Sequence, residues 1–70
     1  MNRQQDQNTL LSTEALAAEL NLAVETLAEW RRQHRGPAYI KAGRRVLYRR
    51  DDIDTWLANN RHSFDAAVQP

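Results

Sequence analysis

The segment WRRQHRGPAYIKAGRRVLYRR, residues 30–50, decides the fold, because its apolar residues change there from helical to strand-like spacing. Pro37 has no N–H to donate and disfavours helical backbone at Gly36, so a helix that enters this segment must end there. Beyond that point, apolar and polar residues alternate on both sides of Gly43-Arg44, which supplies turn chemistry. The pattern predicts a short two-stranded hairpin, which is marginally stable alone and therefore has to pack on helices.

Positive charge is concentrated in the same segment. Residues 30–50 hold eight basic residues and no acidic residue, although the whole chain carries a net charge of only +1. Eight like charges without interspersed acids repel one another, so the segment is a candidate surface for binding a polyanion. For Arg31 and Arg35 taken singly, a solvated position that complements the negative end of a helix is the simpler interpretation.

Two helices are predicted before this segment. The first, at about residues 13–20, follows Ser12 as its N-cap, and the second runs from residue 24 to about residue 33. Asn21 tolerates left-handed backbone, so a short turn over residues 21–23 can join the two helices. Helix, short turn and helix form the length pattern of a helix-turn-helix, although any small α-helical hairpin shows the same pattern.

A third helix is predicted after the hairpin, with Asp51 as N-cap, Asp52 and Asp54 in its first turn, and an end near Asn59-Asn60. The predicted fold class is mainly α with a small β-hairpin. It is a winged helix-turn-helix, in which the hairpin forms a two-stranded wing before the third helix. The expected core draws apolar residues from all these elements: Leu11, Leu16, Ala17, Leu20, Leu22, Leu27, Trp30, Ile40, Val46, Tyr48, Ile53, Trp56 and Leu57.

One domain is predicted over residues 10–60, between a disordered polar tail at 1–9 and a flexible tail at 61–70. The chain has no cysteine, which excludes disulfides and thiolate zinc sites, and it has no apolar run long enough to cross a membrane. Its polar start carries no export signal, so we expect a cytoplasmic location.

No residue pattern indicates catalysis or cofactor binding. His34 and His62 lack metal-ligand spacing, and the aspartates at 51–54 are explained by their place at a helix start. No candidate nucleophile has a suitable histidine base, and no glycine loop of the phosphate-binding type is present. We therefore expect a non-enzymatic protein with no metal and no cofactor.

The run LLSTEALAAELNLAVETLAEWRRQHRGPAYIKAGRRVLYRRDDIDTWL, residues 10–57, resembles the MerR-like winged helix-turn-helix domains of the excisionase family. Trp30, the segment GPAYIKAGRRVLYRR at 36–50 and the segment DDIDTWL at 51–57 carry the resemblance. It implies binding of double-stranded DNA by a prophage or mobile-element protein that directs excision, or by a small transcriptional regulator of such an element. It also implies an integrase or recombinase as partner, and cooperative self-association of several protomers on repeated DNA sites.

In such domains the second helix reads the major groove while the wing grips a neighbouring minor groove. Matched residue by residue, the resemblance implies that the candidate DNA contacts on the helix are Val24, Glu25, Thr26, Ala28 and Glu29, and that those on the wing are Lys41, Arg44 and Arg45. The basic clusters beside them add Arg31, Arg32, Arg35 and Arg49. The chain departs from the family at positions 23, 24 and 29, where the family tends to carry Ser, Arg and another basic residue.

Two side chains and the overall function each allow an alternative interpretation. Glu29 on the second helix could accept a hydrogen bond from cytosine N4, and an ion pair with Arg32 is at least as plausible. Leu47, which strand alternation places outward beside Arg45, is either an ordinary exposed leucine or a contact between protomers. The rival function is a protein-interaction module whose basic face binds an acidic protein partner such as a recombinase.

Overall fold

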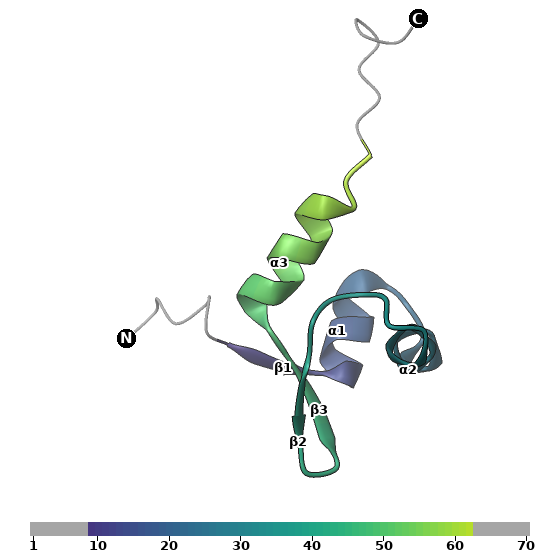
Figure 1. Cartoon of the computed structure of the whole chain (residues 1–70), viewed down its shortest axis with the longest axis vertical. Helices are drawn as coiled ribbons and strands as arrows, with labels where there is room; N and C mark the ends of the chain where they lie inside the picture. The colour runs from purple at the N-terminus through teal and green to yellow at the C-terminus, as the bar shows by residue number, and fades with distance from the viewer. Residues whose placement is uncertain (1–8, 63–70) are drawn as a thin grey trace, which may run out of the picture.

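The computed structural model describes residues 9–62, which form three helices and one antiparallel sheet. Along the chain the elements are β1 (Leu10–Ser12), α1 (Thr13–Leu20), α2 (Val24–Arg32), β2 (Ile40–Ala42), β3 (Arg45–Arg49) and α3 (Arg50–Asn59). In Figure 1, α1 and α2 lie together beside the sheet, α3 extends away from the end of β3, and the β2–β3 turn projects from the body. This arrangement confirms the winged helix-turn-helix class. The tails predicted at 1–9 and 61–70 lie outside the described residues, apart from positions 9, 61 and 62.

The helix-turn-helix forms as its sequence signals predict. The Ser12 side chain caps α1 by accepting a hydrogen bond from the backbone N–H of Ala15, over 3.0 Å. Asn21 adopts left-handed backbone with φ 60°, and Leu22 N donates to Ala17 O over 2.8 Å. These bonds satisfy the end of α1 within one turn, so α2 begins at residue 24.

The chain turns sharply between α2 and the wing. His34 and Gly36 have φ values of 58° and 91°, and Arg35 N donates to Trp30 O over 2.8 Å. A Cβ atom at Gly36 would lie only 2.9 Å from Cε3 of Trp30, so the backbone passes against the indole where a larger residue would collide. Pro37 follows in a buried position. Gly36-Pro37 therefore directs the chain out of α2 and back toward the sheet, as the sequence predicts.

The sheet has three strands, one more than the sequence predicts. Its order is β1-β3-β2, with both neighbours antiparallel to β3. Leu11 lies opposite Tyr48 across β1 and β3, so the residues that lead into α1 complete the sheet. The predicted two-stranded wing is confirmed as β2 and β3, and β1 is a further strand of the sheet that the sequence did not predict. Three residues are too few to show the alternation of a strand, and β1 exists because β3 offers its second edge.

The register corrects the predicted core. Ile40 lies opposite Leu47 on the outer face of the sheet and is 39% exposed, so its assignment to the core was wrong. Leu47 lies on this outer face, as predicted, and is half-buried. Tyr48 points to the opposite face and is 1% exposed. Leu57 was also wrongly placed in the core, since it is 39% exposed. It belongs to α3, the helix that extends away from the sheet in Figure 1.

Five buried residues, contributed by all three helices and β3, form the centre of the domain: Leu16, Ala17, Leu27, Tyr48 and Ile53. Leu11, Leu20, Leu22, Trp30 and Val46 are partly buried and pack against them. Trp56 joins α3 to the end of α2, since its ring centroid lies 5.3 Å from that of Trp30. The core thus fixes α2 and the sheet relative to each other.

The third helix begins at Arg50, and the prediction of Asp51 as its N-cap was wrong. Arg49 occupies the N-cap position and makes no capping bond through its side chain. Arg50 N donates instead to Thr9 O over 2.9 Å, so strand pairing continues into the first residue of the helix. The Arg50 guanidinium also binds Glu19 of α1 over 2.5 and 3.1 Å, and its hydrogen bond lowers the pKa of the Glu19 carboxyl. Arg50 therefore ties α3 to α1.

Candidate nucleic-acid interface

The α2 helix presents one face to the core and another to solvent. Leu27 is fully buried, whereas Val24 at the start of the helix is 37% exposed and Glu25 is exposed beside it. Thr26 and Ala28 are half-buried. The residues of α2 predicted to read DNA therefore lie beside the buried Leu27. Val24 and Glu25, at the N-terminal end of the helix, are exposed.

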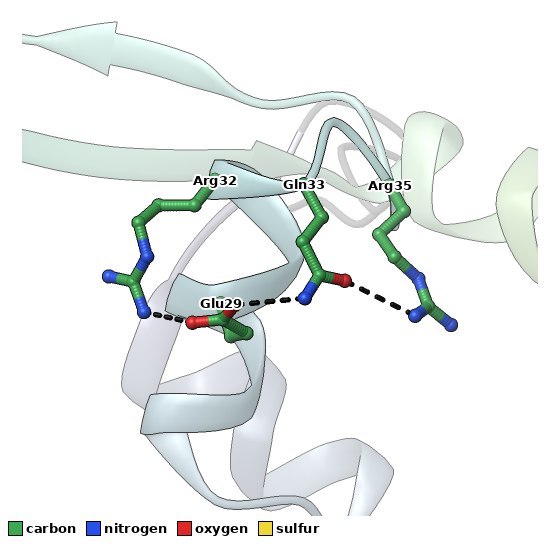
Figure 2. Close-up of polar contacts among 4 residues, drawn as sticks. All are labelled: Glu29, Arg32, Gln33 and Arg35. Carbon is green, nitrogen blue, oxygen red and sulfur yellow. Dashed lines mark hydrogen bonds and ion pairs between the residues drawn. The ribbon is translucent and has the colours of Figure 1, made fainter.

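Polar side chains at the C-terminal end of α2 bind one another (Figure 2). Glu29 accepts hydrogen bonds from the Arg32 guanidinium and, over 2.8 Å, from Nε2 of Gln33. Gln33 in turn accepts a bond from Nη1 of Arg35 over 3.3 Å. The bond from Arg32, followed by that from Gln33, lowers the pKa of the Glu29 carboxyl. Of the two roles considered for Glu29, the structure contains the ion pair with Arg32.

The wing carries positive charge that no ion pair within the described residues neutralises. Lys41, Arg44 and Arg45 are exposed, and none of them forms an ion pair within residues 9–62. Gly43 at the tip has φ 63°, and a Cβ there would meet no atom within 4 Å, so the turn stands free of the body. Long basic side chains on a narrow free tip suit contact with a phosphate backbone or entry into a minor groove.

A groove connects the wing to the helix-turn-helix. It has a volume of about 370 Å³ and is lined by residues from β1, α1, α2 and the wing: Ser12, Thr13, Glu14, Val24, Arg31, Arg44, Arg45 and Val46. The structure thus brings together two of the predicted wing contacts and the first residue of the predicted reading helix. Arg49 does not line this groove, and its guanidinium lies 3.6 Å from Asp51.

Arg31 occupies the inner part of this interface. Its Nη1 donates to the Tyr48 hydroxyl over 2.8 Å and to the Thr13 hydroxyl over 3.5 Å. The guanidinium also lies 5.7 Å from the centre of the Tyr39 ring. The sequence signalled the charge of Arg31 but not its partners Thr13 and Tyr48, which lie 18 and 17 residues away along the chain. A buried tyrosine hydroxyl requires a hydrogen-bond partner. The predicted burial of Tyr48 was therefore the sequence feature that could have indicated such a partner.

Residues 9–62 show neither a candidate metal site nor a candidate membrane span. They contain no group of three or more His, Cys, Asp or Glu side chains that could hold a metal ion. No helix in this part of the chain is long and apolar enough to cross a membrane.

Replacing Glu29 by Gln is expected to strengthen binding to a mixed-sequence DNA duplex by about tenfold at ~0.1 M salt, because the Arg32 charge is released to contact a phosphate. Fluorescence anisotropy over a salt series measures this change. Asp52→Asn is the matched control, since it removes the same charge on α3, where Asp52 forms no ion pair within residues 9–62, and it should change the affinity less. Weaker binding by Glu29→Gln would instead indicate that the carboxylate contacts a base.

Comparison with known families adds one finding. A family model described as a helix-turn-helix domain matches residues 10–61, which include every described helix and strand. No curated protein and no solved structure matches the chain.

Proposed function

Because the chain belongs to the helix-turn-helix domain family, we propose that it binds double-stranded DNA, with α2 in the major groove and the wing against the neighbouring backbone. The observation that carries the proposal is the wing itself. Arg44 and Arg45 are exposed, form no ion pair within residues 9–62, and line the same groove as Val24 of α2. A single duplex can therefore meet the wing and the start of α2 together.

In this proposal the wing contacts phosphates and α2 contacts bases. Charged wing residues contact phosphates, which supplies affinity and fixes the register of the protein on the duplex. The exposed N-terminal end of α2 offers Val24 as an apolar contact and Glu25 as an acceptor, and these groups suit a thymine methyl and cytosine N4. Because α2 offers few such groups, we expect sequence-directed binding of modest selectivity by one protomer.

The proposed cellular role is that of an excisionase of a prophage or mobile element, or of a small transcriptional regulator of one. The support is the resemblance of residues 10–57 to MerR-like excisionase domains, and the small surface that one domain of this size presents. A single module buries too little area for high specificity, so several protomers on repeated sites, acting beside an integrase or a polymerase, fit the role.

Selection of bound duplexes from a random pool, followed by footprinting, tests this proposal. We expect enrichment of short sites that cover one stretch of major groove and the adjacent minor groove for each protomer. Repeated sites beside the recombination site of an integrase would support the excisionase role, and sites over a promoter would support the regulator. Binding without any enriched sequence would contradict sequence-directed recognition and leave only backbone binding.

A further inference from the structure

We propose that the groove between the wing and the start of α1 holds one phosphate of the DNA backbone, and that Arg31 is the residue that binds it. This inference rests on the proposed function and adds a defined contact to it. The sequence offers Arg31 as one of several basic candidate contacts, and for Arg31 taken singly a solvated position is the simpler interpretation. The structure gives Arg31 neutral partners and a place in the wall of the groove.

The guanidinium of Arg31 is anchored by neutral groups. Both of its hydrogen bonds go to hydroxyls, those of Tyr48 and Thr13, whose residues are 1% and 9% exposed. Hydroxyl oxygens accept hydrogen bonds but carry no net charge, and Arg31 forms no ion pair within residues 9–62. A half-buried cation without an anion is costly, so this side chain is prepared for an anionic ligand.

The geometry leaves donors for such a ligand. Both described bonds use Nη1, and a guanidinium has five N–H groups, so the groups on Nη2 and Nε remain for an anion. Because Tyr48 and Thr13 hold Nη1 in place, the planar fork is already oriented before a ligand arrives. Less side-chain entropy is then lost on binding than for a mobile surface arginine.

The other residues that line the groove suit a phosphate of the DNA backbone. Arg44 and Arg45 line it from the wing and Arg31 lines it from α2, so three arginine residues border one space of about 370 Å³. One negative group also lies in the wall, the exposed carboxylate of Glu14. A carboxylate at this place opposes an anion, so Glu14→Gln provides a variant whose effect has the opposite sign.

Replacing Arg31 by Met, which keeps an unbranched apolar chain about as long as the aliphatic stem of arginine and removes the guanidinium, tests the inference. In fluorescence anisotropy with a mixed-sequence duplex, we expect about tenfold weaker binding at ~0.1 M salt and a salt slope smaller by about one unit, as for one lost phosphate contact. The loss should be equal on different sequences, because a phosphate carries no base information. Glu14→Gln should bind about threefold more tightly under the same conditions.

Two further variants keep the test valid if Arg31→Met does not fold. Arg31→Lys keeps the charge without the planar fork, and Tyr48→Phe keeps the guanidinium but removes one anchor. The affinities of the wild-type protein and of Arg31→Lys are then measured on duplexes in which single phosphates are replaced by neutral methylphosphonates. One position should weaken wild-type binding and have a smaller effect on Arg31→Lys. No such position, or an unchanged salt slope in folded Arg31→Met, would overturn the inference.

The outcomes separate this inference from the proposed function. If the wild type shows salt-dependent binding that Arg44→Ala/Arg45→Ala weakens but Arg31→Met does not, only the phosphate site in the groove is refuted. If the wild type binds no duplex at low salt, both proposals fail. Inorganic phosphate that shifts the Nε–H resonance of Arg31 in a protein that binds no duplex would assign the groove to a free phosphate and refute the DNA contact.

Discussion

Replacing Arg44 and Arg45 together by Ala is expected to weaken binding to a mixed-sequence duplex by about a hundredfold at ~0.1 M salt, and to reduce the salt slope by about two units. Each lost phosphate contact removes the release of about one counterion, so two contacts account for both changes. Neither arginine forms an ion pair within residues 9–62, so the substitutions remove charge that the protein does not itself use. Anisotropy titrations at several salt concentrations measure both quantities.

The control for this prediction is Arg61→Ala, which removes one positive charge, half of that removed by the wing variant, at an exposed position beyond α3. It should change the affinity little, because Arg61 does not line the groove. Thermal melting should give nearly equal transition temperatures for the three proteins, since the substituted side chains are exposed. Equal losses of binding free energy per removed charge in both variants would mean that overall charge, and not the wing, governs binding.

Leu27→Ala is expected to remove about half or more of the stability of the domain. Leu27 is fully buried and belongs to the cluster that joins α2 to α1, β3 and α3. Truncation of a buried leucine costs about 2–5 kcal/mol, and a domain this small has a total stability near the lower end of about 5–15 kcal/mol. Loss of the helical circular dichroism signal in urea or on heating measures the effect.

Leu57→Ala is the matched control, because it makes the same chemical change where the side chain is 39% exposed. We expect a cost below about 1 kcal/mol there. A loss of stability as large as that of Leu27→Ala would mean that Leu57 is covered and belongs to the core, as its spacing in the sequence suggested.

Much of the fold was predictable because local chemistry determines it. Ser12 caps α1, Asn21 adopts the left-handed turn and Gly36 marks the reversal after α2, and each needs only its immediate neighbours. The strand β1 was missed because three residues acquire their conformation from β3, far along the chain. The register of Ile40 was missed for the same reason, since alternation alone does not say which residue of β3 it faces.

The candidate site, like the fold, has features that the sequence predicts and features that only the packed structure shows. The concentration of charge in residues 30–50 is visible in the sequence, and the pairing of Glu29 with Arg32 follows from helical spacing. The anchoring of Arg31 by Thr13 and Tyr48 was not predictable, because it requires α1, α2 and β3 to be packed together. Sequence therefore identifies the charges, and packing decides which of them are held in place.

Titration of the ¹⁵N-labelled protein with a short duplex, followed by amide chemical shifts, tests the central claim most directly. We predict that the shifts concentrate in residues 24–28 at the start of α2 and in residues 43–45 at the wing tip, and weaken as salt is raised. Amides near the end of α3, at residues 57–60, should stay unchanged. Shifts confined to α3 or to the outer face of the sheet, or no shifts at low salt, would contradict DNA binding through α2 and the wing.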